Sequence, residues 1–440
     1  MKGNSSYWTD FAAKCREELL SNVMPFWMKY GWDRKNGGVY TCLDRDGSLM
    51  DTTKSVWFQG RFGWMTAYAY RTVAASATGV VKVDSLARGC RGCRDSTGLE
   101  KQRREWLAAS KSCCEFLEKH CFDRDGRAFF EVTAEGVGLR KRRYVFSECF
   151  AAMAYAEYAL ASGETAWARK AVSLFKRIRL FMSEPETYMP AKYTKELKTQ
   201  GHSLTMILIN VANVLKQVSN DPVLDRQITE SVEALVKYFI HPEFKALLET
   251  VGPNGELIDT LAGRTINPGH CIETAWFLMD VAVARKDKSL LSTALQILDW
   301  SWAWGWDDSV LSPPSATALA GRAGRPQPAG SGGIISFRDC KGFPPQCYEQ
   351  DMKFWWPQCE AIIATAYAYR LTGDRKYQKW HRLASTWAWK HLKDKKFPEW
   401  YGYLHRDGTV AQPAKGNIFK GPFHIPRMLV KSMEICEELK

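Results

Sequence analysis

The chain has 440 residues, of which 45% are hydrophobic and 25% charged, a balance typical of a soluble globular protein. No run approaches the roughly 18 apolar residues of a membrane span, and the N-terminal residues lack the apolar core of a signal peptide. We therefore expect a cytoplasmic protein without a membrane partner. The formal net charge of +13 is spread over short runs at 101–104, 140–143 and 393–396. This spread indicates solvated surface, so we expect no nucleic-acid partner.

Cysteine usage also indicates the cytoplasm, which is a reducing compartment. The thirteen cysteines are an odd number scattered through helical patterns, as expected of thiols that act as small hydrophobic side chains. The one C-x-x-C motif, Cys90 to Cys93, has no second pair at zinc-finger spacing. We therefore expect no metal site.

Apolar residues recur with a period near 3.6 along most of the chain, which predicts an all-α fold. Short connections between these segments indicate antiparallel helical hairpins. The predicted helices are 5–29, 54–77, 102–121, 144–162, 164–182, 201–218, 222–240, 268–285, 287–304, 352–372, 375–392 and 422–438.

Short β-type pieces with turn chemistry separate some of the helices. Several consist of a β-branched or aromatic run, a D-G or N-G turn and a second short run, which predicts small hairpins. These pieces are 37–50, 127–139, 246–259, 332–344 and 399–412.

Recurring helix, hairpin and helix units predict a closed toroid. The sequence "AYAY" occurs at 67–70 and 366–369, and "AYAE" at 154–157, each on an even-numbered predicted helix. Six helix pairs that close on themselves form an (α/α)6 barrel, in which one helix of each pair lies inside. Because small residues suit a crowded inner ring, we expect the even-numbered helices to be the inner ones.

Two segments interrupt the rhythm of helix pairs. Residues 312–333 are rich in Pro, Gly, Ala and Ser and cannot bury enough apolar surface to become ordered. Residues 79–102 are similar but less extreme. Since the helix pairs continue across both, we expect one domain spanning 1–440 with flexible insertions at these two places.

Polar residues in otherwise apolar even-numbered helices mark the candidate site. If those helices form the inner ring, their first turns converge at one end of the barrel axis and build a single pocket. The residues are Gln59, Arg61, Glu148, His202, His270, Glu273, Glu360, His424 and Arg427.

Two of these residues, His270 and His424, each begin a predicted helix. Asn267 is a suitable N-cap with Pro268 at the first helical position, and Gly421 and Pro422 precede the second histidine. Because the positive end of a helix dipole disfavours imidazolium, we expect both rings to be neutral bases. A lone histidine at a helix start usually makes only a local hydrogen bond. The matched placement of two favours an acid/base pair that exchanges a proton on the two faces of one carbon.

The inner carboxylates leave a second chemistry open. Glu148, Glu273 and Glu360 lie on inner helices, and a pair of acids at suitable separation supports glycoside hydrolysis. That interpretation would leave the two helix-start histidines unexplained. No P-loop, Rossmann glycine fingerprint, nucleophile elbow or His-Glu-x-x-His motif occurs.

The motifs "WFQGR", "FSECF", "INPGHCIETAWF", "KFWWPQCE", "EWYGYLHRDG" and "FKGPFHIPR", in this order and spacing, closely resemble the N-acylglucosamine 2-epimerase family, also called renin-binding proteins. The resemblance covers nearly the whole chain except the two insertions. It implies an (α/α)6 barrel, usually a homodimer, that interconverts N-acetylglucosamine and N-acetylmannosamine. A renin-type protease is not an expected partner of a chain without a secretory signal.

The resemblance also implies roles for individual residues. His270 and His424 correspond to the acid/base pair, Arg61 to a substrate-binding arginine, and Glu273, Glu360 and Arg427 to their partners. It implies no consumed cofactor, and a nucleotide such as ATP as an activator. A related aldose–ketose isomerase, or a 2-epimerase for another sugar, is the alternative on the same barrel.

One position departs from the family pattern. The motif around 354–364 usually reads W-W-P-H in these enzymes, and here Gln358 replaces that histidine. Because glutamine does not titrate, an auxiliary acid/base role at this position would be lost. The substitution puts the sugar preference of this chain in doubt.

Overall fold

The computed structural model describes residues 2–78, 96–189, 194, 196–308 and 330–439. Twelve main helices alternate between an inner and an outer layer. The inner helices are α3 (Val56–Thr78), α6 (Phe146–Ser162), α9 (His202–Lys216), α11 (Pro268–Arg285), α13 (Trp355–Thr372) and α15 (His424–Glu437). The outer helices are α1 (Lys2–Glu18), α5 (Ser96–His120), α7 (Thr165–Ser183), α10 (Pro222–Ala234), α12 (Lys288–Gly305) and α14 (Arg375–His391).

Short helical pieces extend two of the outer helices. The first continues through η1 (Leu19–Val23), α2 (Met24–Phe26) and η2 (Trp27–Gly31), and α10 continues through η3 (Leu235–Phe239). A single turn, α8 (Pro185–Tyr188), follows α7. With these pieces joined to their neighbours, the twelve predicted helices are confirmed. None of the helices in the described ranges is long and apolar enough to cross a membrane.

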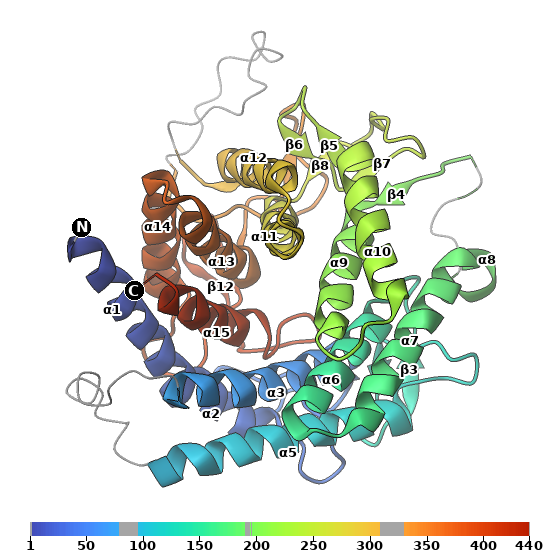
Figure 1. The fold of residues 1–440 in the computed structure, drawn as a ribbon, viewed down its shortest axis with the longest axis vertical. Coiled ribbons are helices and arrows are strands. Elements are labelled where there is room, and N and C mark those ends of the chain that lie inside the picture. Colours follow the sequence, from blue (N-terminus) through green and yellow to red (C-terminus); the bar gives the residue numbers. More distant parts are fainter. Residues whose placement is uncertain (1, 79–95, 190–193, 195, 309–329, 440) are drawn as a thin grey trace.

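The inner helices form a closed ring. Each packs against the next in chain order, and α15 completes the circle by packing against both α1 and α3 (Figure 1). Every residue of α6 from 147 to 159 is buried, as expected of a helix enclosed on all sides. The outer helix α14, by contrast, exposes Arg375, Lys379 and Arg382. The fold is therefore the predicted (α/α)6 barrel, with the even-numbered helices inside.

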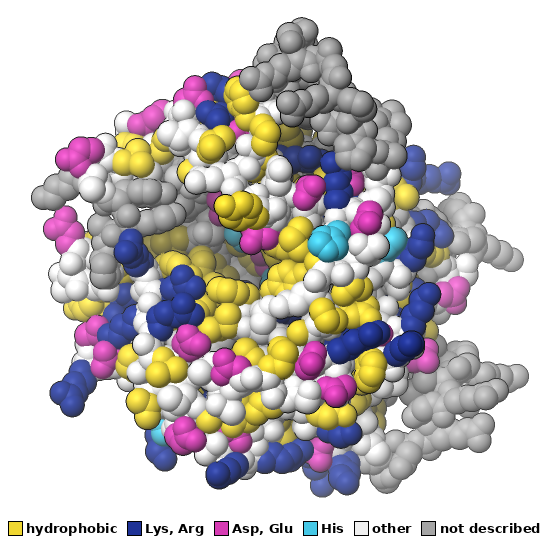
Figure 2. Space-filling model, turned by 180° about the vertical axis from the view of Figure 1, so that it is seen from behind, with side chains coloured by type: hydrophobic (Ala, Val, Ile, Leu, Met, Phe, Trp, Pro, Cys, Tyr) yellow, Lys and Arg dark blue, Asp and Glu magenta, His cyan; other side chains and the backbone are white. Residues whose placement is uncertain are grey.

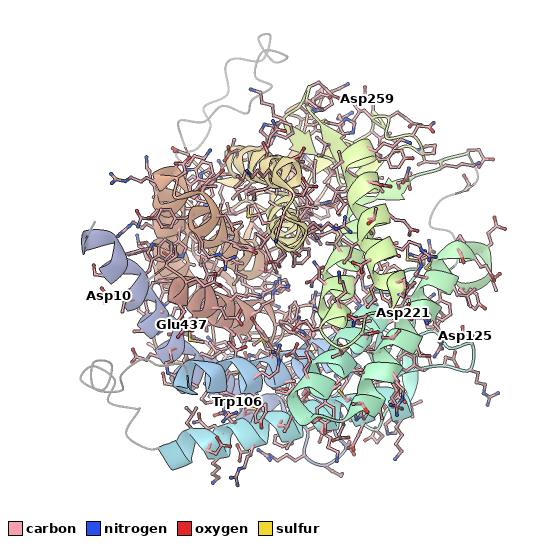
Figure 3. The ribbon with its side chains drawn as sticks, in the orientation of Figure 1. Asp10, Trp106, Asp125, Asp221, Asp259 and Glu437 are labelled. Atoms are coloured by element: carbon pink, nitrogen blue, oxygen red, sulfur yellow. The ribbon has the colours of Figure 1, made fainter. Side chains whose placement is uncertain are left out.

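Side chains fill the space between the two layers, whereas the labelled Asp125 and Asp259 lie at the outer edge (Figure 3). Asp221 lies at the start of α10, where its carboxylate caps the helix by accepting from the backbone N–H of Val223 at 3.0 Å.

The predicted insertions are longer than the structure allows. Helix α5 begins at Ser96 rather than at 102, and Glu100 and Arg103 of its first turns form an ion pair of 2.6 Å. Residues 330–333 of the second insertion are likewise ordered, since Gly332 N–H donates to the carbonyl of Asp307 at 2.9 Å. Residues 79–95 and 309–329, which include Cys90 and Cys93, lie outside the described residues.

Short strands occupy the connections that lead into the inner helices. One three-stranded sheet contains β1 (Lys54–Ser55), β2 (Glu131–Val132) and β3 (Gly138–Arg140). A second contains β10 (Lys353–Phe354), β11 (Tyr403–Leu404) and β12 (Val410–Gln412). The two-stranded pairs are β4 (Gln200–Gly201) with β7 (Thr250–Val251), β5 (Ile240–His241) with β6 (Ala246–Leu247), and β8 (Thr265–Ile266) with β9 (Arg338–Asp339).

Only two of the five predicted pieces are hairpins of paired strands. The pieces 127–139 and 399–412 supply the pairs β2–β3 and β11–β12, whereas 37–50 contributes only to isolated bridges. The predictions for 246–259 and 332–344 are wrong, because their strands pair with strands outside these pieces. Turn residues show where the chain reverses. They do not select the partner when several connections meet at one end of a barrel.

Candidate active site

Two histidines, two glutamates and an arginine from three inner helices form a polar cluster in the barrel. Arg427 donates from one nitrogen, Nη2, to Oε1 of Glu273 at 2.6 Å and to Oε1 of Glu360 at 2.7 Å. The Nδ1 atom of His424 lies 2.8 Å from the same oxygen of Glu360. All four side chains are buried. The structure therefore brings together four of the nine residues predicted for the site, and His270 lies nearby.

Helix geometry explains this convergence. Helix α15 begins at His424, so Arg427, three residues later, lies on the same face. Glu273 and Glu360 occupy the second turns of α11 and α13, which pack against each other, and α13 also packs against α15. Trp276, three residues after Glu273, donates its indole N–H to Oε2 of Glu360 at 2.9 Å. The carboxylate of Glu360 is thus fixed by three donors.

The surroundings of His424 favour the neutral ring. Burial, together with the positive charges of Arg427 and Arg61, lowers the pKa of His424 well below its usual range. The ionised carboxylate of Glu360 can only accept a hydrogen bond, so Nδ1 of His424 donates to it and Nε2 is left as a base. The two carboxylates raise the pKa of Arg427 despite its burial, so this guanidinium stays charged. The prediction of a neutral helix-start histidine is confirmed at this position.

His270 lies at the start of α11 in a different electrostatic setting. As predicted, Asn267 caps the helix and accepts from the backbone N–H of His270 at 3.2 Å. The ring Nδ1 lies 3.1 Å from both carboxylate oxygens of Glu249. Burial alone would lower the pKa of His270, but Glu249 outweighs it and raises the pKa. The expected lowering of the pKa is therefore wrong for His270, because the nearby carboxylate of Glu249 shifts this pKa upwards.

Trp356 joins the two histidines. Its ring centroid lies 5.0 Å from that of His270 and 5.9 Å from that of His424. The contact requires Gly269, because a Cβ there would lie 2.5 Å from the indole. His270 has 27% of its side chain exposed and His424 has 8%, so the His270 side of this indole is the more open. The middle of the molecule is hollowed when seen from behind, and hydrophobic side chains form much of the wall (Figure 2).

Arg61 on α3 completes the site with an unsatisfied donor. Its guanidinium lies over the rings of Phe150 and Phe423, at 4.1 Å and 4.8 Å from their centroids. The Nε atom is buried without a hydrogen-bond partner in the described structure. Burial lowers the pKa of Arg61 to about 9, opposed by Glu273. An unpartnered cationic donor of this kind suits an oxygen atom on which negative charge develops.

Comparison with known proteins places the chain in a family. The profile of the N-acylglucosamine 2-epimerase (GlcNAc 2-epimerase) family matches residues 96–311 and 319–422. The chain belongs to the N-acylglucosamine 2-epimerase family. A Bos taurus protein named N-acylglucosamine 2-epimerase is 29% identical over 438 residues, which cover 98% of this chain and 91% of that one. The chain is therefore an isomerase of the carbohydrate 2-epimerase class.

Solved structures show the same fold. The cellobiose 2-epimerase of Bacillus thermoamylovorans B4167 superposes with a TM-score of 0.75 at 18% identity, covering 97% of this chain and 99% of that one. A D-mannose isomerase superposes with a TM-score of 0.68 at 16% identity, covering 97% of each chain. At these identities the likeness establishes the barrel and not the substrate.

Glu148 lies apart from the cluster in this family member. Its Oε1 accepts from Nε of Arg127 at 2.6 Å and from the backbone N–H of Ala128 at 2.9 Å. Both side chains of this ion pair are buried. The carboxylate thus holds the connection before α6, and its predicted contact with substrate stays a prediction.

Gln59 and Gln358 hold backbone in the same way. Oε1 of Gln358 accepts from the N–H of Ile334 at 2.7 Å, and Nε2 donates to the carbonyl of the same residue at 2.8 Å. Gln59 makes the same two bonds with Val39, at 2.7 Å and 2.9 Å. A titrating side chain is not needed for this contact. In this chain Gln358 therefore acts as a backbone clamp and not as an acid or base.

Removing this clamp should reduce stability without removing a catalytic group. In Gln358→Ala the buried N–H and carbonyl of Ile334 lose their partners, which costs about 1–3 kcal/mol each. We expect the free energy of unfolding to fall by roughly 2–5 kcal/mol, measured by urea denaturation. Gln358→His keeps part of the contact and should lose less. A gain of stability in Gln358→Ala would contradict the clamp.

Three groups of the site could in principle hold a cation. One ligand atom each from Glu273, Glu360 and His424 lies within 4.8 Å of the others. Arg427 already donates to both carboxylates and supplies the compensating charge. A divalent cation at this position would have to displace the guanidinium. The donor set therefore fits a buried ion network better than a metal site.

Glu249 and Trp356 are the residues that sequence reasoning missed. Trp356 lies in the quoted motif "KFWWPQCE". Its neighbours Phe354 and Trp355 are also aromatic, so the sequence alone did not single it out. Glu249 lies in a piece that the sequence predicts to be a hairpin, 21 residues before His270. In the sequence, Glu249 is an acidic residue between two short apolar runs. This pattern is too common to identify a site residue.

Proposed function

We propose that the protein interconverts N-acetylglucosamine and N-acetylmannosamine by moving a proton at C2 of the open-chain sugar. What carries the proposal is the pair of histidines beside one indole ring, each hydrogen-bonded through Nδ1 to its own glutamate. The family relationship and the named relative support the choice of sugar. Two such groups are what a change of configuration at one carbon requires.

The chemistry follows from the charges of the site. The C2 proton of the open-chain sugar is acidified by the neighbouring carbonyl, and neutral His424 takes it with Nε2. Negative charge then develops on the carbonyl oxygen, where the guanidinium of Arg61 can stabilise it. His270, whose pKa Glu249 raises, returns a proton to the opposite face of C2. Since the two sugars have the same oxidation level, the reaction requires no redox cofactor.

Proton exchange with solvent tests this proposal directly. The protein is incubated with N-acetylmannosamine and ATP in deuterated water, and C2 is followed by NMR. We expect N-acetylglucosamine that carries deuterium at C2. His405, an exposed residue of the turn between β11 and β12, provides the control variant His405→Asn, which should behave as the wild type.

Other outcomes would select the alternatives. Conversion of mannose to fructose without turnover of the N-acetylated sugars would identify an aldose–ketose isomerase. Turnover of a disaccharide such as cellobiose at its reducing end would identify a 2-epimerase for another sugar. Release of free sugar from a glycoside would favour the hydrolase interpretation of the inner carboxylates.

We also propose a cytoplasmic homodimer whose activity a nucleotide increases without being consumed. The support is the resemblance to the family. A non-hydrolysable ATP analogue should raise the rate as ATP does, and sedimentation at several protein concentrations should give the mass of two chains. Loss of stimulation with the analogue would contradict an effector role.

A further inference from the structure

Glu249 connects the predicted acid/base residue His270 to a second histidine. Its two carboxylate oxygens lie 3.1 Å from Nδ1 of His270, and Oε2 lies 3.6 Å from Nδ1 of His202. His202 is fully buried at the start of α9, and its Nε2 lies 2.8 Å from Oγ1 of Thr274 on α11. The two imidazole centroids are 6.4 Å apart. One carboxylate is therefore enclosed between two rings from different inner helices.

The backbone around Glu249 fixes this carboxylate. The residue lies between β6 and β7, where its N–H donates to the carbonyl of Thr265 at 3.0 Å. Its own carbonyl accepts from the N–H of His202, also at 3.0 Å. Thr265 leads into α11 and His202 begins α9, so the main chain ties Glu249 to both helices that carry its histidine partners. The side chain has little freedom to leave them.

We propose that Glu249 is a positioning residue that holds His270 by Nδ1 and keeps its proton, so that the two acid/base histidines rest in unlike proton states. This inference rests on the proposed function. Nε2 of His270 makes no hydrogen bond in the described part of the chain and is left for the substrate. His202 contributes by holding Glu249 from its other side.

The two carboxylate–histidine pairs differ in their surroundings, which explains the difference in proton state. Glu360 is shared with the charged Arg427, whereas the titratable groups beside Glu249 in the described part of the chain are the two imidazoles. Burial would raise the pKa of Glu249, but His270 and His202 outweigh it and lower that pKa. The charged and titratable groups that act on His270 are Glu249, Glu273, Glu360, His202 and His424.

The position of the proton before a turnover is then defined. At rest the proton of the pair is on His270, and His424 is the base. One turnover breaks the C2–H bond to His424 and forms a new C2–H bond from His270, which leaves the proton on His424. The reverse reaction starts from that second state. Exchange of protons with solvent returns the enzyme to its resting state. Glu249 determines how strongly the state with the proton on His270 is favoured over the state with the proton on His424.

The variant Glu249→Gln tests this role, since it keeps the size of the side chain and removes the charge. We expect kcat/KM to fall about ten- to a hundredfold at neutral pH, because general acid–base groups contribute roughly 10²- to 10⁴-fold. Loss of the proton from His270 causes kcat/KM to fall at alkaline pH. Because removal of the Glu249 charge lowers the pKa of His270, this alkaline limb should move to lower pH. The acidic limb, set by His424, should move much less.

Two further variants separate positioning from folding. Glu249→Asp restores the charge and should return the alkaline limb toward the wild-type position. Glu243→Gln is the matched control, because Glu243 makes a 2.9 Å contact with Nδ1 of His241 outside the site. It should leave both limbs unchanged. An alkaline limb that stays in place in Glu249→Gln, in a folded protein, would overturn the proposal.

A measurement without substrate keeps this test independent of the proposed function. The ring of His270 is followed by NMR titration in ¹³C-histidine-labelled protein, with its signal assigned by its loss in His270→Asn. It should titrate at lower pH in Glu249→Gln than in the wild type. If the sugars do not react but this shift occurs, the proposed function fails and the role of Glu249 stands. Equal titration in both proteins overturns that role.

Discussion

In His270→Asn and His424→Asn, interconversion of the two sugars should be lost, whereas exchange of the C2 proton should survive with one sugar in each variant. Each histidine faces one side of C2, so the remaining histidine can still remove the proton of the epimer that presents its C–H bond to it. It cannot deliver a proton to the other face. We expect interconversion to fall by about 10²- to 10⁴-fold.

The measurement is incorporation of deuterium at C2, followed by NMR for each pure sugar with each variant. The result assigns each histidine to one epimer, which the geometry alone does not do. His405→Asn should exchange and interconvert both sugars. If one variant exchanges both sugars and the other exchanges neither, a single base serves both faces, and the two-histidine mechanism is wrong.

The architecture was predictable because inner and outer helices bury different fractions of their surface. Segment 146–162 is apolar on every side, and the structure buries 13 consecutive residues there. Segment 375–391 carries Arg375, Lys379 and Arg382 on one face, as an outer helix does. The recurring small residues of the even-numbered helices assigned them to the inner layer, and the burial of 147–159 in α6 agrees with that assignment. The partners of the strands in 246–259 and 332–344 were not predictable, because two-residue strands from separate connections meet only in the folded chain.

The candidate site was predictable only as far as it lies on helices. His424 and Arg427 share a face because they are three residues apart, and the first turns of inner helices meet at one end of a barrel. Glu249 is different. It reaches His270 through a connection whose path no local pattern specifies, and its charge reverses the expected pKa shift of that ring.

The backbone clamps show a signal that was present but not recognised. Gln59 follows Lys54 by five residues, and Gln358 follows Lys353 by the same interval. Each lysine is buried in an ion pair, with Asp33 at 2.7 Å and with Asp307 at 2.8 Å. A basic residue, aromatic residues and then a polar acceptor thus form a repeated structural unit. Comparing these segments with each other would have identified Gln358 as structural.

Arg427→Met should destabilise the protein by about 3–5 kcal/mol, the range typical of breaking a buried ion pair by removing one partner. Glu360 would keep two donors, His424 and Trp276. Glu273 has Arg427 as its one hydrogen-bond partner in the described structure, so it would be left as a buried carboxylate without a hydrogen-bond donor. The free energy of unfolding is measured by urea denaturation, and the exposed Arg226 provides the control Arg226→Met, expected to change it by less than about 0.5 kcal/mol.

A second substitution can separate the two carboxylates. Glu273→Gln added to Arg427→Met should restore a substantial part of the lost stability, because it removes the uncompensated charge, whereas Glu360→Gln should not. Neither double variant should regain activity. Arg427 also lowers the pKa of His424, so any residual activity of Arg427→Met should have its acidic limb at higher pH. If Glu360→Gln rescued stability better than Glu273→Gln, the charge of the network would be centred on Glu360, and the arrangement inferred for this site would be wrong.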